Sequence, residues 1–163
     1  MQDAGMAMME SFGADVRNNV FENCRFGIRF SVGCANNLIE NNEFSSMSQY
    51  GIYTYQGSDL PAVNDSPDAD GRPKNNVFNK NVISNVTIGV HINEGDNNEF
   101  TENVFTAVQR FNVEDGVGNL FMNNTVFTAC LEAGTGAALG NIPRCDGEAD
   151  SGEEDDDLGG SEE

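Results

Sequence analysis

A nine-residue phrase recurs five times along the chain and constrains its fold more than any other feature. The copies read NNVFENCRF, NNLIENNEF, NNVFNKNVI, NNEFTENVF and GNLFMNNTV, beginning at residues 18, 36, 75, 97 and 118. The starts are 18, 39, 22 and 21 residues apart, and the spacing of 39 corresponds to about one repeat plus a loop. Repetition with a period of roughly 20 to 22 residues predicts a solenoid, whose repeats stack so that equivalent positions form rows.

Two positions of the phrase stay apolar while their neighbours are polar, so we expect both to face a core. The fourth position is Phe21, Ile39, Phe78, Phe100 and Phe121, and the ninth is Phe26, Phe44, Ile83, Phe105 and Val126. These apolar sites lie close together, Asn and Gly interrupt the sequence every few residues, and no helical periodicity is sustained. A leucine-rich repeat needs a ladder of leucines, which are few here. The sequence therefore predicts an all-β fold, a right-handed parallel β-helix solenoid of about five coils.

Asparagines also recur in columns, at points where the chain must turn. One column holds Asn37, Asn76, Asn98 and Asn119, and a second holds Asn23, Asn81, Asn103 and Asn124. Asn tolerates the left-handed backbone conformation, and its amide can bond backbone groups. We therefore expect stacked asparagines to form ladders that satisfy turn amides from coil to coil, which is a scaffold role and not a ligand-binding one.

The chain divides into an N-terminal segment over 1–14, a β-helix domain over 15–145 with an inserted loop at 58–74, and an acidic tail over 146–163. The tail holds ten acidic residues and no basic ones, so it supplies −10 of the net charge of −19. Such a segment cannot bury apolar surface, and we expect it to be disordered. The first coil begins close to Met1, which leaves little room for the polar cap that a solenoid end needs. We therefore expect segment 1–14 to be a truncated coil, with upstream β-helix coils missing from this chain.

The strong negative charge argues against nucleic acid or an anionic membrane as a partner. No run of apolar residues is long enough to span a bilayer, and the opening residues show no signal peptide. Three N-glycosylation sequons, beginning at Asn64, Asn85 and Asn123, are compatible with a secretory route. We expect an extracellular or cell-wall location.

The chain has four cysteines, and their spacing does not match a zinc site. Three disulfide pairings are possible. A bond between Cys130 and Cys145 would close the last coil against the tail. The alternative is that the cysteines are free, buried and act as small apolar residues.

A second, shorter strand follows four of the phrases and alternates with a period of two. The segments are 27–31, 51–55, 89–93 and 110–114. Alternation predicts that Ile28, Ile52, Val90 and Phe111 point inward, as do Phe30, Thr54, Ile92 and Val113. Two outward rows should result, one of Arg29, Tyr53, His91 and Asn112 and the other of Ser31, Tyr55, Asn93 and Glu114. Neighbours in a row should lie about 4.8 Å apart, one strand spacing.

The inserted loop over 58–74 follows directly after one of these outward strands, so it can form one wall of a groove over the rows. Arg72 and Lys74 at its end could contact an anionic substrate. Its aspartates could hold Ca²⁺, and they are Asp59, Asp65, Asp68 and Asp70. Their spacing matches neither an EF-hand nor a nonapeptide calcium repeat. We therefore expect no metal site and no cofactor, with Ca²⁺ as the alternative.

Four segments, GIRFSVG at 27–33, YGIYTYQGSD at 50–59, DGRPKNN at 70–76 and IGVHINEGDNN at 88–98, resemble the β-helix of mannuronan C-5-epimerases, especially those of brown algae. The similarity covers roughly residues 15–128. It implies that the substrate is alginate, an anionic polysaccharide, and that β-D-mannuronate is converted to α-L-guluronate within the polymer. The family's Asp-Pro-His-Asp signature is absent here, so the chain resembles only the C-terminal part of such a helix.

The epimerisation that this resemblance implies needs a base to remove the C-5 proton, a cation to neutralise the carboxylate and an acid on the opposite face. Arg29 is the candidate for carboxylate neutralisation, His91 for the base and Tyr53 for the acid. Tyr53 and Tyr55 could stack on sugar rings, and Asn93 and Asn112 could help to orient the sugar.

Two other functions fit the same features. A polyuronate lyase would share the fold and the proton abstraction but would then expel the 4-O-linked sugar. A non-catalytic carbohydrate-binding β-helix module would explain the absent signature and the small size.

Overall fold

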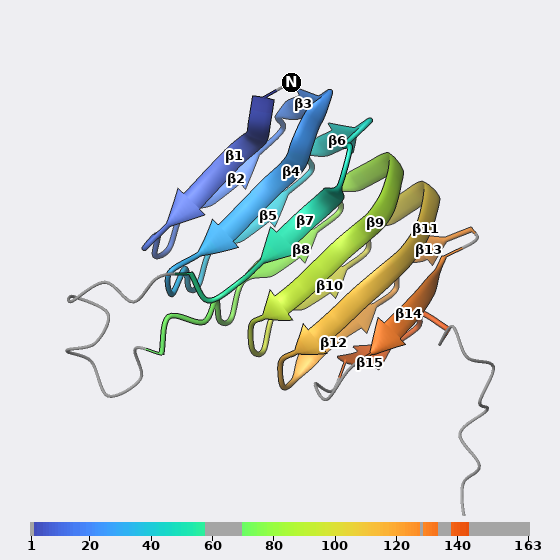
Figure 1. The fold of residues 1–163 in the computed structure, drawn as a ribbon. Coiled ribbons are helices and arrows are strands. Elements are labelled where there is room, and N and C mark those ends of the chain that lie inside the picture. Colours follow the sequence, from blue (N-terminus) through green and yellow to red (C-terminus); the bar gives the residue numbers. More distant parts are fainter. Residues whose placement is uncertain (1, 58–69, 128, 134–137, 144–163) are drawn as a thin grey trace, which may run out of the picture.

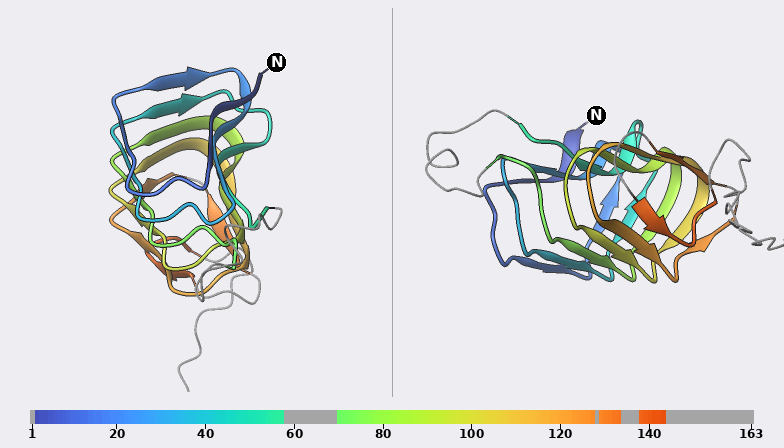
Figure 2. Two further views of the ribbon diagram at one scale, coloured as in Figure 1. Left: turned by 90° about the vertical axis from the view of Figure 1, so that its left-hand side faces the viewer. Right: turned by 90° about the horizontal axis from the view of Figure 1, so that it is seen from below.

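The computed structural model describes residues 2–57, 70–127, 129–133 and 138–143. These residues form strands and turns without helices, and every strand pairing is parallel. Figure 1 shows the long strands of one sheet in front of the short strands of the other, and Figure 2 shows the coils stacked along one axis. The predicted parallel β-helix of about five coils is confirmed.

The strands form two sheets. The six-stranded sheet contains β2 (Asp15–Arg17), β5 (Leu38–Glu40), β8 (Val77–Asn79), β10 (Glu99–Thr101), β12 (Asn119–Met122) and β15 (Ala138–Gly140). The nine-stranded sheet contains β1 (Gln2–Met9), β3 (Val20–Glu22), β4 (Cys24–Ser31), β6 (Glu43–Ser45), β7 (Tyr50–Thr54), β9 (Val82–Glu94), β11 (Val104–Asp115), β13 (Thr125–Val126) and β14 (Cys130–Ala133). Segment 2–9 of the predicted N-terminal part is therefore a strand, which pairs with β4.

The core between the sheets is built from two apolar columns. The first is Val16, Ile39, Phe78, Phe100 and Phe121, and the second is Phe21, Phe44, Ile83, Phe105 and Val126. The rings of Phe78 and Phe100 stack at 4.8 Å between centroids, and those of Phe100 and Phe121 at 4.6 Å. Because each coil repeats the same side chain one strand spacing along the axis, the aromatic rings stack face to face.

The predicted columns were wrong in the first coil. Phe21 belongs to the second column and Val16 takes its place in the first, while Phe26 lies outside the core cluster. The register offset between the first two coils is 23 residues, from Asp15 paired with Leu38, and not the 18 that the phrase suggests. Each coil turns twice at equivalent positions, and the first coil has Gly13-Ala14 at one turn and Asn18-Asn19 at the other. The phrase at residue 18 was therefore aligned with the wrong turn.

The asparagine ladders are present and have the predicted scaffold role. In each ladder the side-chain Nδ2 of one Asn donates to the Oδ1 of the next at 2.9 to 3.1 Å. One ladder is Asn37, Asn76, Asn98 and Asn119, and the other is Asn19, Asn42, Asn81, Asn103 and Asn124. Asn23 was wrongly assigned to the second ladder. It is exposed, with a φ of 58°.

The glycines at the start of the outward strands allow a close approach between coils. A Cβ atom on Gly51 would lie 2.6 Å from the carbonyl oxygen of Gly89 and 2.7 Å from Cγ2 of Ile83. Neither neighbour can move without shifting the adjacent coil, because packed interiors have little free volume. The same position in the preceding coil is Gly27, whose Cβ would lie 2.4 Å from the carbonyl oxygen of Gly51.

We expect Gly51→Ala to lower the free energy of unfolding by about 2 to 3 kcal/mol, the usual cost of overpacking a tight interior site. Chemical denaturation monitored by circular dichroism measures this loss. Gly13→Asn is the matched control, because a Cβ there meets nothing within 4 Å and Asn tolerates its positive φ. Equal stability of Gly51→Ala and the parent protein would contradict the close packing described around Gly51.

The cysteines divide into two kinds. Cys24 and Cys34 are free and buried, which is the alternative that the sequence left open. Cys130 is in a disulfide, and its expected partner Cys145 lies outside the described residues. Most of the inserted loop, 58–69, and the acidic tail over 146–163 also lie outside them.

Candidate functional site

The first outward row is formed by residues in direct register on four neighbouring strands. Arg29 of β4 pairs with Tyr53 of β7, Tyr53 pairs with His91 of β9, and His91 pairs with Asn112 of β11. The flanking residues on each strand, such as Ile28 and Phe30 on β4, are fully buried in the core. The alternation therefore places Arg29, Tyr53, His91 and Asn112 side by side on the outside of the nine-stranded sheet, as the sequence predicts.

The second row is less regular than predicted. Tyr55 and Asn93 are partly exposed and Glu114 is exposed, but Ser31 is fully buried. The chain at Gly57 covers it, since a Cβ there would lie 3.4 Å from the Cβ of Ser31. The prediction that Ser31 lies on the open surface was therefore wrong, because strand alternation alone does not show that the chain at Gly57 packs against β4.

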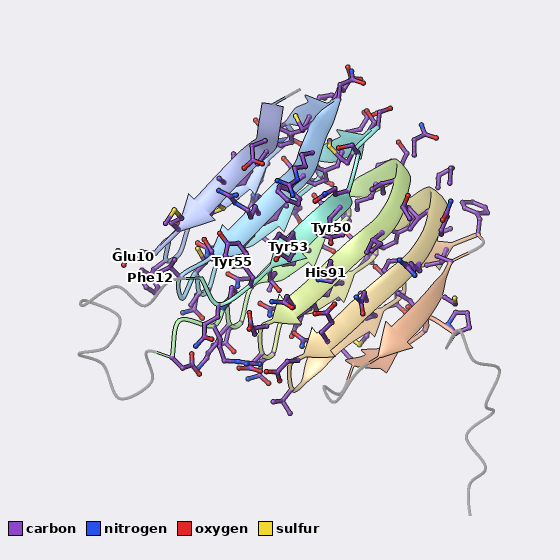
Figure 3. All side chains as sticks on the ribbon, viewed as in Figure 1. Glu10, Phe12, Tyr50, Tyr53, Tyr55 and His91 are labelled. Carbon is purple, nitrogen blue, oxygen red and sulfur yellow. The ribbon has the colours of Figure 1, made fainter. Side chains whose placement is uncertain are left out.

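Five rings gather on this outer surface, which we call the aromatic face: Phe26, Tyr50, Tyr53, Tyr55 and His91. Figure 3 shows Tyr50 and Tyr53 on β7, Tyr55 directly after its end, and His91 beside them on β9. Tyr53 is the hub. Its ring centroid lies 5.0 Å from those of Tyr50 and Tyr55, 5.2 Å from His91 and 5.3 Å from Phe26. The face contains every tyrosine and the only histidine of the chain.

Sequence reasoning missed two members of the aromatic face, Phe26 and Tyr50. They are in register with each other, and each directly precedes one of the closely packed corner glycines, Gly27 and Gly51. The Cβ positions of Gly27 and Gly51 point toward the core side chains Phe44 and Ile83, so the residue before each glycine points outward. An aromatic residue before each corner glycine was the signal that could have found them.

The hydrogen bonds around His91 fit the neutral form of its ring. Its ring is only 6% exposed and stacks on Tyr50, with 4.5 Å between the ring centroids. The Nδ2 of Asn112 lies 3.2 Å from His91 Nδ1 and 3.0 Å from Oε1 of Glu114. Because the carboxylate can only accept, it fixes Nδ2 of the amide as the donor to both partners, and His91 Nδ1 must be an unprotonated acceptor. The neutral ring therefore carries its proton on Nε2, which lies 3.6 Å from Oε1 of Glu114.

The pKa values of the two central rings are shifted in opposite directions. Burial lowers the pKa of His91, with the nearby charge of Arg110 adding to the effect and that of Glu114 opposing it. Burial also raises the pKa of Tyr53, helped by Tyr50, Tyr55, Glu94 and Glu114. Both shifts favour the neutral form. At neutral pH the face therefore presents a phenol hydroxyl and an uncharged imidazole.

Arg29 supplies positive charge at one side of the aromatic face. Its Nη1 lies 2.9 Å from Oδ2 of Asp3, and the same carboxylate lies 3.5 Å from Nη1 of Arg25. Asp3 is exposed, so a ligand carboxylate can compete with it for the guanidinium. In the described part of the chain, Arg29 Nε is buried without a hydrogen-bond partner.

Two carboxylates lie on the opposite side of the face, at the ends of β9 and β11. Oε2 of Glu94 accepts hydrogen bonds from the backbone N–H of Gln56 at 2.8 Å and from Nδ2 of Asn93 at 3.0 Å. Glu114 accepts from Asn112. Neither Glu94 nor Glu114 was among the predicted site residues, although Glu114 was placed in the second row. Their hydrogen bonds to the rows could not be read from spacing alone.

The structure does not place Arg72 and Lys74 with the outward rows. The guanidinium of Arg72 forms two hydrogen bonds to Asp96, at 2.8 and 3.1 Å, and a third to Asp115 at 3.0 Å. These bonds raise the pKa of Arg72, the one to Asp96 most strongly. Nζ of Lys74 lies 2.8 Å from Oδ2 of Asp70. Both cations are therefore bound by acidic residues of the chain, and Arg72 in particular connects the end of the inserted loop to the turn after β9 and to the last residue of β11.

The described residues contain no group of three or more His, Cys, Asp or Glu side chains that could hold a metal ion. Of the aspartates proposed for Ca²⁺, Asp59, Asp65 and Asp68 lie outside the described residues. In the same part of the chain, no helix has the length and apolar character needed to cross a bilayer.

Comparison with known families agrees with the coil geometry. The model of the family described as the right handed beta helix region matches residues 1–126, and the chain therefore belongs to this family. The fold is a right-handed parallel β-helix. Neither the curated proteins nor the solved structures include a match.

Proposed function

We propose that the aromatic face binds a polysaccharide chain. The observation that carries this proposal is the gathering of all three tyrosines, the only histidine and Phe26 on the outside of three adjacent strands, in ring contact with one another. The three tyrosines are partly exposed, whereas Phe26 and His91 are buried in contact with them, at 5% and 6% exposure. Partly exposed aromatic rings grouped on an outer surface are typical of an interaction site.

The groups around the rings fit a sugar. The three tyrosines are partly exposed, and an aromatic ring with a polar edge suits a ligand that has both C–H surfaces and hydroxyl groups. Asn93 and Asn112 supply amides, while Glu94 and Glu114 supply carboxylates that accept hydrogen bonds from hydroxyls. The overall charge of −19 disfavours nucleic acid and anionic membranes as ligands.

Alginate is the first polysaccharide to test, on the strength of the resemblance to mannuronan C-5-epimerases. Arg29 is the residue that would receive a uronate carboxylate, in exchange for the exposed Asp3. Ca²⁺ held jointly by polymer and protein is an alternative way to join two anions. Titrations with and without a chelator distinguish the two, because binding through Arg29 alone does not need the metal.

We expect Tyr53→Ala to weaken alginate oligosaccharide binding about tenfold, because it removes the ring that contacts the other four. Isothermal titration calorimetry measures the affinity. Tyr53→Phe should stay within about twofold, since the ring remains and only the hydroxyl is lost. Met122→Ala, on the six-stranded sheet, is the control for a surface change away from the face. Unchanged affinity in Tyr53→Ala would refute this binding site.

Mannuronate C-5-epimerisation is the second candidate function, and the adjacency of Arg29, Tyr53 and His91 favours it. Arg29 would neutralise the carboxylate, and the neutral Tyr53 hydroxyl would return a proton to C-5. His91 would serve as base only if Nδ1 were released from Asn112, because that nitrogen already accepts a hydrogen bond. A binding module without catalysis therefore needs fewer assumptions than the enzyme.

Incubation with polymannuronate in deuterated water separates the candidates. Deuterium at C-5 with inverted configuration identifies an epimerase, whereas an unsaturated product that absorbs ultraviolet light identifies a lyase. Binding with neither change supports the non-catalytic module. Turnover that persists in both His91→Asn and Tyr53→Phe would exclude this face as the catalytic centre.

An extracellular or cell-wall location goes with a polysaccharide ligand. The disulfide at Cys130 is favoured by an oxidising compartment. Asn85 and Asn123, which begin two of the three sequons, are exposed, the first within β9 and the second at the bend after β12, and are accessible to glycosylation. Expression in a secreting host followed by mass spectrometry of these two sites tests the location: unmodified asparagines and a free Cys130 thiol would argue against it.

A further inference from the structure

His91 lies where its proton controls the charge and hydrogen bonding of the aromatic face. In the neutral state one amide group, Nδ2 of Asn112, donates both to His91 Nδ1 and to Oε1 of Glu114. Protonation would place a hydrogen on Nδ1 facing this donor at 3.2 Å. Two donors cannot share that contact, so the existing arrangement is compatible only with neutral His91.

The groups that face His91 come from the two neighbouring strands, β7 and β11. Tyr50 and Tyr53 of β7 contact the ring from one side, and Arg110 and Glu114 of β11 act on it from the other. Glu94 lies three residues along β9, and Arg29 lies two strands away in the same row. Among these, Glu114 is the carboxylate already within 3.6 Å of Nε2, so it is the group that an imidazolium would attract.

We infer that His91 is a proton-operated switch that couples acidification to the binding of anionic sugars at the aromatic face. Proton uptake turns the Asn112 amide away, because its donor then faces Nδ1–H, and it brings Glu114 onto the imidazolium as an ion pair. The charge of Glu114 is then compensated inside the cluster. A uronate that stacks on the tyrosines meets one negative charge fewer, and a neutral sugar meets no electrostatic change.

The inference rests on the proposed polysaccharide-binding function only for its ligand step, since the rearrangement itself needs no ligand. The lowered pKa of His91 sets the range in which the switch acts, below the ordinary histidine value of about 6.5. The sign of the stability effect follows. As pH falls, His91 is protonated first in the unfolded chain, because its pKa is higher there. The stabilisation from neutral His91 is therefore fully present above the ordinary histidine pKa, and it is lost as pH falls from that value to the lower pKa of the folded protein.

The composition of the chain makes the switch directly observable. His91 is the only histidine, there is no tryptophan, and all three tyrosines belong to the face. A pH titration followed by NMR therefore reads one imidazole, and tyrosine fluorescence reads only the aromatic face. We expect the His91 carbon and nitrogen shifts, the Asn112 side-chain amide shifts and the tyrosine fluorescence to change together, with one midpoint below about 6.5.

Variants decide whether the named contacts cause this behaviour. Asn112→Ala removes the opposing donor and should raise the His91 midpoint, whereas Glu114→Gln removes the stabilising charge and should lower it. His91→Asn should abolish the coupled change in tyrosine fluorescence. Asp15→Asn, on the six-stranded sheet, is the control for removal of a distant charge. An Asn112 amide that does not respond when His91 titrates, or a midpoint unmoved in both Asn112→Ala and Glu114→Gln, would overturn the inference.

Binding measurements test the ligand step. Between pH 7.5 and 5, where a uronate stays ionised, we expect the affinity for mannuronate oligosaccharides to rise about three- to tenfold. A neutral glucan oligomer should show no such rise, and His91→Asn should remove it. By linkage, saturating mannuronate must raise the His91 midpoint by the logarithm of the same factor. A flat pH profile refutes the coupling, whereas absence of binding at every pH refutes the proposed function, and the ligand-free titration then decides the rearrangement alone.

Discussion

Replacement of Asn81 by Ala should lower the free energy of unfolding by about 4 kcal/mol, the largest effect that we expect from any single substitution. The side chain of Asn81 is fully buried in the middle of the second ladder. Its Nδ2 donates to the carbonyl of Ile39 at 2.9 Å and to Oδ1 of Asn103 at 3.0 Å. Its Oδ1 accepts from the backbone N–H of Asn42 at 2.9 Å and from Nδ2 of the same residue at 3.1 Å.

The magnitude follows from what is left behind. Truncation leaves polar atoms on both adjacent coils without their hydrogen-bond partners. Each buried unsatisfied group costs roughly 1 to 3 kcal/mol. Asn41→Gly is the matched control, because Asn41 is the exposed residue before the neighbouring ladder position and has a φ of 54°, which glycine adopts freely. Urea denaturation of both variants compares the two sites. A loss below about 1 kcal/mol in Asn81→Ala would mean that the ladder does not stabilise the coils.

Replacement of Arg72 by Met should lower the free energy of unfolding by about 3 kcal/mol, because it leaves Asp96 as a nearly buried charge without its guanidinium partner. The side chains of Arg72 and Asp96 are only 16% and 13% exposed, and Arg72 also bonds the carboxylate and carbonyl of Asp115. Asp96 keeps one hydrogen bond, from the backbone N–H of Val117 at 3.0 Å, which does not neutralise its charge.

Two further variants test this explanation of the Arg72 effect. Lys74→Met removes an ion pair that is more exposed, and we expect it to cost less than about 1 kcal/mol. The double variant Arg72→Met with Asp96→Asn should recover part of the loss, since no buried charge is then left alone. Thermal unfolding at one pH provides the comparison. If the loss in the double variant equals the sum of the losses in Arg72→Met and Asp96→Asn measured singly, the ion-pair explanation is contradicted.

The fold could be predicted from the sequence because a solenoid repeats the same residue pattern in every coil. One apolar position per short strand and one asparagine per turn recur at nearly constant spacing, so an error at one coil does not change the class of fold. The register of the first coil could not be predicted. The first coil has Gly13-Ala14 at one turn and Asn18-Asn19 at the other. The asparagine pair therefore indicated the wrong turn, and the predicted columns of Phe21 and Phe26 were wrong.

The outward row could also be predicted, because period-two alternation fixes which side chains leave the core. Arg29, Tyr53, His91 and Asn112 lie as that rule requires. The outward positions of Tyr50 and Phe26 could not be predicted from alternation, because alternation is interrupted at the corner glycines. Gly27 and Ile28 are consecutive, yet both face the interior. The pairing of Arg72 with Asp96 and Asp115 joins residues 24 and 43 positions apart, and no local pattern connects them.

NMR of the aromatic side chains during titration with a mannuronate oligosaccharide tests most directly whether this outer surface is the binding site. We predict that the resonances of Tyr50, Tyr53, Tyr55 and His91 shift with the same saturation curve. Leu38 and Val77 on the outside of the six-stranded sheet should stay unchanged. Saturable binding that shifts residues of the six-stranded sheet and leaves the three tyrosines and His91 unmoved would contradict the account.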